Sequence, residues 1–188
     1  MVRRLIFALL AKALKNSSIN SISKSPHFWD INSKSYEKYG LPPKSITHST
    51  KFIQKGNPFL GICIGMQALF EKSYEFGVHD GLGYIKGVVK RFSDELIMKG
   101  MKIPHTGWNS VHFKENHPVF KDIKQDSYFY FVHSFYGECA DEKNIQGRTN
   151  YGIDFVSAVT YENITGVQFH PEKSQQAGLK LMENFCNL

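Results

Sequence analysis

Cys63 stands inside a glycine-flanked segment, Gly61–Gln67 (GICIGMQ). The run before it, Pro58–Ile62, is apolar and typical of a strand, and Met66–Phe76 after it repeats apolar residues on one helical stripe. Cys63 is therefore predicted at a sharp turn between a strand and a helix. Small neighbours are needed there, because the backbone is strained and crowded. The first N–H groups of the helix favour a thiolate and can hold an oxyanion, so the segment predicts a cysteine nucleophile.

His170 and Glu172 lie in a second block, Gly166–Ser174 (GVQFHPEKS). Gly166–Phe169 is typical of a strand that Pro171 ends, so the imidazole of His170 is expected at a strand end. Glu172 can accept the imidazole N–H across the following turn, which would fix the tautomer and support the imidazolium. This is the nucleophile, base and orienting acid of a catalytic triad. The order Cys, then His-x-Glu, excludes the papain arrangement, in which an Asn well beyond the His orients it.

Each of these residues alone has a simpler structural interpretation. A single Cys after an apolar strand is usually a buried core thiol, and a His before Pro is usually a turn residue. The whole pattern of both blocks is much rarer by chance than either residue, so it favours the triad.

The two blocks together resemble the class I, triad-type glutamine amidotransferases. Three further stretches, Glu75–Phe92, Lys102–Val111 and Ser127–Tyr136, resemble the glutaminase subunit of imidazole glycerol phosphate synthase, an enzyme of histidine biosynthesis. The resemblance runs from about Phe52 to the C-terminus. The PHxGWN and YFVHS patterns also occur in relatives that serve nucleotide-sugar amidation, so that acceptor stays open as an alternative.

The resemblance implies hydrolysis of L-glutamine to glutamate and ammonia. Cys63 would attack the side-chain amide carbon, and His170 would donate a proton to the leaving ammonia and then activate water. The substrate-binding residues that the resemblance implies are Ile64 (through its backbone N–H), Gln67, His133 and Ser134. Without it, Gln67 would be a surface helix residue and His133 a core or capping histidine.

The segment PHTGWN supplies His105, Trp108 and Asn109. It is typical of a turn with an aromatic anchor, and the resemblance places it at a partner interface, where Trp is a common anchor. The implied partner is a (β/α)8-barrel cyclase in a heterodimer, which would receive ammonia by a sealed route. No barrel pattern occurs in this sequence, so synthase activity would require that partner. No cofactor is implied.

Residues 1–51 depart from the resembling family. Neither its opening D-Y-G-x-G-N-like string nor its P-G-V-G-like loop, which supplies a second oxyanion N–H, is found there. Gene decay, a frameshift or a cloning error would each produce such a stretch. We therefore expect an intact triad with weakened glutaminase activity, and a catalytically impaired binding subunit is a second alternative function.

Composition bounds the class of protein. A length of 188 residues with 41% hydrophobic and 14% aromatic residues predicts one globular domain, 1–188, of which 1–51 is divergent. No apolar run approaches the ~18–20 residues of a membrane span. The start, Arg3–Ala13, resembles a signal peptide, but Lys12 interrupts its short apolar run, so an amphipathic helix is favoured.

Charge and cysteine content limit the kinds of partner and the cellular compartment that the sequence predicts. The net charge of +6 would suit nucleic acid, but the 23 Lys and Arg are scattered and the aromatics lie in strand-like runs, so no nucleic-acid partner is predicted. A phosphorylated ligand on a partner subunit fits this charge equally well. The three cysteines, Cys63, Cys139 and Cys186, cannot all pair, and their spacing matches no metal motif. A free thiol and no metal favour a reducing cytoplasm.

Strand and helix alternate early, and strands dominate later. This order predicts a three-layer, flavodoxin-like α/β fold of the class I amidotransferase type, with a mixed central sheet and extra antiparallel strands. The predicted strands are Ser18–Ile22, Phe59–Ile62, Tyr84–Phe92, Ser110–Phe113, Tyr128–Val132, Phe155–Tyr161 and Thr165–Phe169, the last two forming a hairpin through Tyr161–Asn163. The predicted helices are Arg3–Lys15, Tyr36–Tyr39, Gly65–Glu75 and Gln176–Asn187.

Overall fold

Two parallel strands, β4 (Phe59–Ile62) and β13 (Ile164–Val167), lead to the two halves of the predicted site. The computed structural model, which describes residues 5–8, 10–11, 28–31, 50–114 and 117–188, pairs them in register from Phe59 with Ile164 to Ile62 with Val167. Both strands are buried along their whole length, which is why neither alternates apolar with polar residues. Because parallel strands end at the same edge of a sheet, the chain leaves both toward one place.

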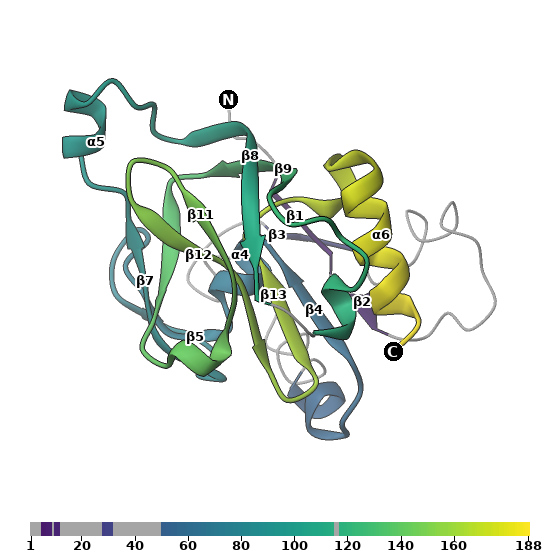
Figure 1. Cartoon of the computed structure of the whole chain (residues 1–188). Coiled ribbons are helices and arrows are strands. Elements are labelled where there is room, and N and C mark those ends of the chain that lie inside the picture. The colour runs from purple at the N-terminus through teal and green to yellow at the C-terminus, as the bar shows by residue number, and fades with distance from the viewer. Residues whose placement is uncertain (1–4, 9, 12–27, 32–49, 115–116) are drawn as a thin grey trace.

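The larger sheet is mixed, as the sequence predicts. Within the described residues its path is β2-β4-β13-β12-β10-β7-β5-β6, and β11, β8 and β9 extend it from β12. The β4–β13 and β5–β7 pairs are parallel and the others antiparallel. The remaining strands are β2 (Leu10–Ala11), β5 (Phe70–Ser73), β6 (His79–Asp80), β7 (Ile85–Arg91), β8 (His105–Phe113), β9 (Ser127–His133), β10 (Phe135–Cys139), β11 (Ile145–Asn150) and β12 (Asp154–Tyr161). Figure 1 shows how they are arranged.

Most strand predictions are confirmed within a few residues. The predicted strand Phe59–Ile62 is β4, and the predictions for β7, β9, β12 and β13 differ from the structure by at most two residues at either end. The hairpin is confirmed too, because Tyr161 pairs with Ile164 and Glu162 takes a positive φ of 50° at the turn. The prediction Ser110–Phe113 is too short, since β8 begins at His105. The sequence did not predict β5, β6, β10 or β11.

The helix predicted over Gly65–Glu75 is wrong beyond its first turn. Helix α4 covers Ile64–Gln67, and the chain then forms β5, which pairs in parallel with β7. Tyr74 N donates to Val89 O at 2.9 Å, so the backbone bonds to a distant strand instead of its own helix. Phe76, predicted on the apolar stripe, is 75% exposed.

The helix predicted over Arg3–Lys15 is also wrong in its described part. Leu5–Ala8 forms β1, which pairs antiparallel with β3 (Phe28–Ile31), and Leu10–Ala11 pairs with β4. Strand pairing with a partner remote in sequence thus replaces the local helix. The predictions Ser18–Ile22 and Tyr36–Tyr39 lie outside the described residues.

Helix α6 (Gln175–Cys186) confirms the predicted C-terminal helix. Figure 1 shows it beside the sheet at the right, whereas the short α5 (Glu95–Met98) lies apart from the sheet at the upper left. The short 3-10 turns are η1 (Pro118–Phe120), η2 (Glu142–Asn144) and η3 (Pro171–Lys173). The predicted three layers and single domain 1–188 stay predictions, since α6 is the one long helix in the described part of the chain.

The core lies on both faces of the sheet. One cluster joins α6 to aromatic side chains of β8, β9, β12 and the segment after β13, among them Phe129, Phe155 and Phe169. A second cluster packs Met66 and Leu69 of the α4 segment against neighbouring strands. The elbow at Cys63 is therefore held from both sides, which is the support that a strained turn requires.

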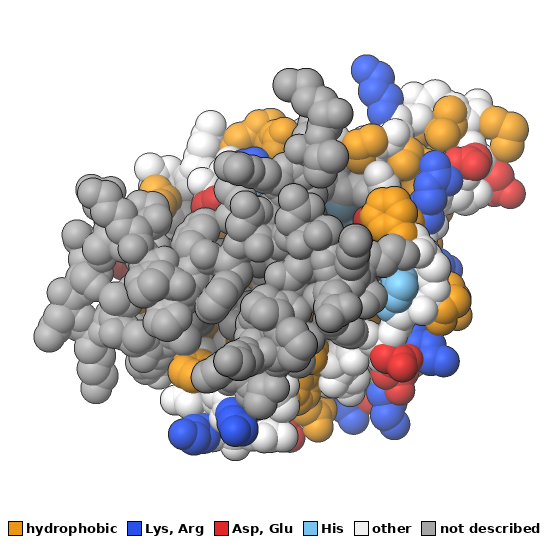
Figure 2. All heavy atoms as spheres, turned by 180° about the vertical axis from the view of Figure 1, so that it is seen from behind, with side chains coloured by type: hydrophobic (Ala, Val, Ile, Leu, Met, Phe, Trp, Pro, Cys, Tyr) orange, Lys and Arg blue, Asp and Glu red, His pale blue; other side chains and the backbone are white. Residues whose placement is uncertain are grey.

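The surface of the described residues carries mixed charge. Figure 2, seen from behind, shows Lys and Arg side chains interspersed with Asp and Glu at its right-hand margin. No helix in the described ranges is long and apolar enough to cross a membrane. The same residues contain no group of three or more His, Cys, Asp and Glu that could hold a metal ion.

Candidate active site

Cys63 occupies a strained turn between β4 and α4, as the sequence predicts. Its φ of 54° and ψ of −110° lie outside the favoured regions for a residue with a side chain, and its N–H donates to Val167 O at 2.7 Å. A Cβ on Gly61 would lie 2.6 Å from the carbonyl oxygen of Gly65. The glycine before Cys63 is thus required by contact with the helix after it.

Helix α4 is a single turn, Ile64–Gln67, that starts directly after the nucleophile. The first N–H groups of a helix have no partner within it, so the N–H of Ile64 is placed for an oxyanion beside the sulfur. One turn gives only a small dipole, and a cationic partner for a thiolate must come from a side chain.

His170 lies three residues beyond the end of β13, and its backbone is bonded to β9. Its N–H donates to Tyr130 O at 2.8 Å, and its carbonyl accepts from Ser174 Oγ at 2.6 Å. The same Ser174 hydroxyl accepts from Tyr130 N at 3.0 Å. Ser174 therefore joins the turn η3 to β9 and holds the backbone on which the imidazole stands.

The imidazole of His170 contacts Glu172, as the sequence predicts. Nδ1 donates to Glu172 Oε1 at 2.7 Å, which fixes the tautomer of the neutral ring. The ring is buried, and Nε2 has no hydrogen-bond partner among the described residues. Burial lowers the pKa of His170, but interactions with Cys63 and Glu172 outweigh it and raise the pKa to about 9.

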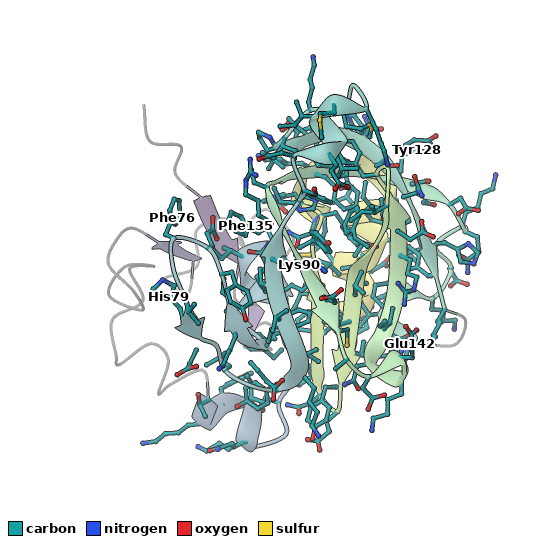
Figure 3. The ribbon with its side chains drawn as sticks, turned by 90° about the vertical axis from the view of Figure 1, so that its left-hand side faces the viewer. Phe76, His79, Lys90, Tyr128, Phe135 and Glu142 are labelled. Atoms are coloured by element: carbon teal, nitrogen blue, oxygen red, sulfur yellow. The ribbon has the colours of Figure 1, made fainter. Side chains whose placement is uncertain are left out.

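Cys63 opens onto a cavity of about 180 Å³. This is smaller than the pockets that hold drug-sized ligands and suits a small metabolite. The lining residues are Cys63, Ile64, Gln67, Glu75, Pro104, Val132, His133, Ser134 and Phe135. All four predicted substrate-binding residues therefore lie at this cavity, and Figure 3 labels Phe135 among the side chains near it.

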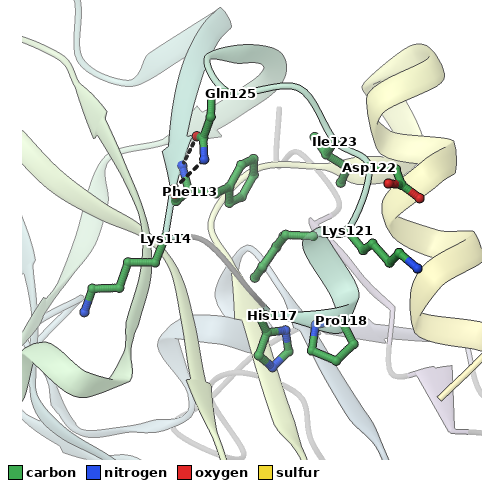
Figure 4. A pocket seen from close by; sticks show the side chains of 9 residues that line it. Phe113, Lys114, His117, Pro118, Lys121, Asp122, Ile123 and Gln125 are labelled. Atoms are coloured by element: carbon green, nitrogen blue, oxygen red, sulfur yellow. Dashed lines mark hydrogen bonds between the residues drawn. The ribbon is translucent and has the colours of Figure 1, made fainter.

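A larger cavity of about 530 Å³ lies elsewhere, around Phe113 and η1 (Figure 4). Its amide side chain, Gln125, is already bonded on both sides to the backbone of Phe113, at 2.9 and 2.8 Å. It contains no residue of the Cys63 site, so the smaller cavity is the candidate active site.

Gln67 is buried, and both hydrogens of its amide nitrogen are used. Nε2 donates to Phe135 O at 2.8 Å and to Gln168 Oε1 at 3.0 Å. It is therefore a fixed wall of the cavity and not the surface helix residue of the simpler interpretation. Only its oxygen is available to a ligand.

His133 and His105 form a buried pair, with 3.0 Å between Nε2 of His133 and Nδ1 of His105. His133 Nδ1 donates to Phe135 O at 2.8 Å, so its Nε2 accepts and His105 Nδ1 donates. Burial lowers the pKa of His105 to about 4, and burial together with its neighbour His105 lowers that of His133 to about 3. Both rings are thus neutral; His133 lines the cavity and His105 supports it from behind.

The segment PHTGWN is not a turn, because His105–Phe113 is strand β8 and pairs with β9. His105 is 2% exposed and stacks on Phe131 and Tyr151, and its predicted place at a partner interface stays a prediction. Asn109 is partly buried and donates to Asn150 O at 2.8 Å.

Trp108 lies on the face of the β8–β9 pair opposite to that of His105 and is 46% exposed. It lies opposite Tyr130 in the register and meets that ring edge-on at 6.1 Å. Tyr128, two residues along β9, is 62% exposed and projects from the surface in Figure 3, and Lys173 Nζ lies 5.6 Å from the Tyr130 ring. We call Trp108, Tyr128, Tyr130 and Lys173 the aromatic surface.

Three residues of the site were not predicted from the sequence: Gln168, Ser174 and Glu75. Gln168 and Ser174 lie within the quoted second block, yet their partners, Gln67 and Tyr130, are remote in sequence. Glu75 lines the cavity, and burial raises the pKa of its carboxyl group. The sequence placed it at the end of the predicted helix Gly65–Glu75, which gave no signal that it returns to the cavity.

Comparisons with known proteins agree with this geometry. The family model of glutamine amidotransferase class-I matches residues 36–187. A protein of Sulfurimonas denitrificans named imidazole glycerol phosphate synthase subunit HisH is 52% identical over 135 residues, covering 72% of this chain and 65% of that protein. The protein of that name in Wolinella succinogenes is 45% identical over 138 residues, covering 73% and 67%. The chain thus spans about two thirds of the length of these relatives.

A solved glutamine amidotransferase of Thermotoga maritima shares the fold. Its TM-score is 0.53 at 18% identity, with 84% of this chain and 60% of that chain covered. The predicted class I amidotransferase-like α/β fold with a mixed sheet is thereby confirmed. The chain belongs to the class-I glutamine amidotransferase family.

Proposed function

We propose that this chain is a glutaminase that hydrolyses L-glutamine to glutamate and ammonia. The observation that carries the proposal is the Cys63 elbow beside an imidazole whose other side is bonded to Glu172 at 2.7 Å. Nucleophile, base and orienting carboxylate are the parts that acyl transfer through a covalent intermediate requires.

The first half of the reaction forms a thioester. The Cys63 thiolate attacks the side-chain amide carbon of glutamine, and the N–H of Ile64 donates to the oxyanion that develops. His170 then gives its Nε2 proton to the leaving nitrogen, so ammonia departs and the glutamyl group stays on sulfur. A pKa raised to about 9 keeps this imidazole protonated at neutral pH, which suits the acid role.

The second half hydrolyses the thioester. His170, neutral after the first proton transfer, takes a proton from water, and the hydroxide adds to the thioester carbon. Glutamate leaves and the thiolate returns. Glu172 keeps the imidazole in one orientation through both halves.

Substrate recognition uses the walls of the cavity. Gln67 lines it and keeps its side-chain oxygen as an acceptor, because its nitrogen is already bonded, and Glu75 supplies an acidic group that can bind the ammonium group of an amino acid. Ser134 and His133 line the side formed by the β9–β10 connection. The neutral state of His133 leaves this wall without a positive charge.

We further propose that the ammonia serves imidazole glycerol phosphate synthesis in histidine biosynthesis. The names of the relatives from Sulfurimonas denitrificans and Wolinella succinogenes support this acceptor over a nucleotide sugar. The partner is then a (β/α)8-barrel cyclase in a heterodimer, and the aromatic surface is its docking site. Exposed Trp and Tyr with a Lys over a ring form the kind of patch that anchors interfaces. Three free thiols fit a cytoplasmic location.

The experiment is glutamate release by the purified chain, alone and with a cyclase subunit of histidine biosynthesis. Release that requires Cys63, rises with the cyclase and is absent in Cys63→Ala supports the proposal. Release that is equal in wild type and Cys63→Ala contradicts it. Stimulation by a nucleotide-sugar enzyme instead of the cyclase would move the acceptor to the alternative class.

A further inference from the structure

We infer that Gln168 is a positioning residue for the Cys63 sulfur: its side-chain amide holds the sulfur in place and presents it with an N–H donor. The inference rests on the proposed glutaminase and adds to it a residue that lies outside the triad. The observations that carry it are the contacts of the Gln168 amide on both sides, its complete burial and the consistency of the hydrogen bonds around it.

Gln168 lies between β13 and His170, with 0% of its surface exposed. Its backbone N–H donates to Ser157 O at 2.9 Å, which ties it to β12. Its side-chain Nε2 lies 3.6 Å from Cys63 Sγ, within the range of a hydrogen bond to sulfur. Its Oε1 accepts from Gln67 Nε2 at 3.0 Å. The amide thus bridges the sulfur to the wall of the cavity.

The orientation of this amide follows from chemistry. Phe135 O can only accept, so the Gln67 atom 2.8 Å away must be the amide nitrogen. That nitrogen can only donate, so the Gln168 atom facing it must be the oxygen. The Gln168 nitrogen is then directed at the sulfur, and the reverse orientation would set two amide nitrogens against each other.

The same carbonyl oxygen of Phe135 joins the pair His105 and His133 to the hydrogen bonds of Gln67 and Gln168. It accepts from Gln67 Nε2 and from His133 Nδ1, each at 2.8 Å. His133 in turn accepts from His105. Because Gln168 Oε1 accepts from a Gln67 nitrogen that is itself held by Phe135 O, rotation of the Gln168 amide would break the bond between the two amides. The donor directed at the sulfur is therefore fixed.

A purely structural role for Gln168 would not require an amide. Gln168 is flanked by the buried apolar residues Val167 and Phe169, and an apolar side chain of the same length would pack there without a buried amide. A donor to sulfur instead favours the anion, because a hydrogen bond to a charged acceptor is stronger than one to a neutral acceptor. His170 and Gln168 would then approach the sulfur as two separate partners.

The test is the rate at which iodoacetamide alkylates Cys63, measured peptide by peptide in the full chain. Gln168→Met keeps the length of the side chain and removes the amide. We expect alkylation of Cys63 to slow roughly 10-fold or more, the scale of one lost hydrogen bond to a charged group, while Cys139 and Cys186 react as in wild type. An unchanged rate for Cys63 in the folded variant would overturn the proposal.

Asn163→Ala is the matched control. The Asn163 amide donates to the backbone of Ile53 and Asn57 at the opposite end of the β4–β13 pair. Its loss should lower stability and leave the alkylation rate of Cys63 unchanged. If both variants slow alkylation equally, loosening of the strand pair explains the effect and the positioning role of Gln168 is contradicted.

Turnover gives a second readout. With glutamine and the cyclase, Gln168→Met should lower kcat roughly 10- to 100-fold and change KM less than about 3-fold, because the contact is to the nucleophile. A raised KM at unchanged kcat would assign Gln168 to substrate binding and overturn the inference. If wild type releases no glutamate, the proposed function fails, and the alkylation comparison still decides the role of Gln168.

If Gln168→Met does not fold, Gln67→Met tests the same series of hydrogen bonds at the residue next to Gln168. It removes the donor that orients the Gln168 oxygen, so alkylation of Cys63 should slow by about 3-fold or more. The double variant, where it folds, should be no slower than Gln168→Met alone, because the two amides act on the sulfur as one unit. An unchanged alkylation rate of Cys63 in Gln67→Met, or fully additive decreases in the double variant, would contradict the proposal that the two amides act together.

Discussion

Glu172 Oε1 lies 2.7 Å from Nδ1 of His170, and Nε2 of the same ring has no hydrogen-bond partner among the described residues. One nitrogen of the imidazole is thus anchored and the other is left for the reaction. The turn η3 and the Ser174 bonds fix this arrangement from the backbone side. The proton affinity of His170 should therefore respond to changes at Glu172.

Glu172→Gln should lower the pKa of His170 below its value of about 9, since the carboxylate is one of the groups that raise it. An NMR titration of the His170 ring measures this directly. Turnover of glutamine should fall in Glu172→Gln but less than in His170→Ala, as removal of the third triad member often does. An unchanged pKa, or equal activity in all three proteins, would show that the pair does not work as proposed.

The same pKa has a consequence for stability. The folded pKa of about 9 lies above the ordinary 6.5, so the His170 proton stabilises the fold fully below pH 6.5, and this contribution is lost as pH rises to about 9. The free energy of unfolding of wild type minus that of His170→Gln should fall across this window. A difference that is constant from about pH 6 to about pH 10 would contradict it.

The buried pair His105 and His133 should make the protein sensitive to acid. Their folded pKa values, about 4 and about 3, lie below the ordinary 6.5, so the unfolded chain takes up protons first and stability falls as pH drops from 6.5 toward 4. Denaturant unfolding of His105→Phe should show a smaller loss of stability over this range. The exposed His112→Ala is the control and should keep the wild-type dependence. Equal acid sensitivity in His105→Phe and wild type would contradict this explanation of the pH dependence.

The sequence predicted the elbow well, because its signals are local. Glycines on both sides of Cys63 record a contact between Gly61 and the helix that follows within a few residues. The His170–Glu172 contact is likewise made across a single turn. Such short-range requirements can be read from spacing alone.

The parts that the sequence did not predict depend on partners remote in the chain. The apolar residues of Met66–Phe76 fit a helical stripe, but Phe70–Ser73 forms a strand because its backbone pairs with β7. Strand β10, with a glycine at its centre, shows no alternation and is held between β7 and β12. Gln168 has the same difficulty, since the residues that give its amide a direction lie 101 and 105 positions away.

Trp108→Ala should weaken binding of the cyclase and leave the fold intact. The side chain is 46% exposed and contacts Tyr130 only by its edge, so its removal costs little in the free chain. As the anchor of the aromatic surface it should contribute about 2 kcal/mol to binding, or about 30-fold in Kd. Titration calorimetry with Leu179→Ala, an exposed apolar residue on α6, as control checks this. Unchanged affinity, or loss of the fold in Trp108→Ala, would mean that Trp108 is not the interface anchor.

Restoring a family-type N-terminus should raise glutaminase activity. Residues 1–51 lack the P-G-V-G-like string, and each oxyanion donor contributes roughly 10²–10³ in kcat. Glutamine turnover by the complex with the cyclase should therefore increase by that order when the string is introduced. Residues 32–49 lie outside the described part of the chain, so this stays a prediction from the sequence. Equal turnover by both proteins would mean that the oxyanion site is complete without that loop.

Covalent labelling by a glutamine-analogue electrophile tests the central claim most directly, because it needs only a reactive Cys63 and a cavity that accepts glutamine. We predict that the analogue labels Cys63, that glutamine protects against it, and that Cys139 and Cys186 are spared, since neither lies on a glycine-flanked elbow. His170→Ala should slow the labelling. Labelling that persists in Cys63→Ala, or that glutamine does not slow, would contradict the account.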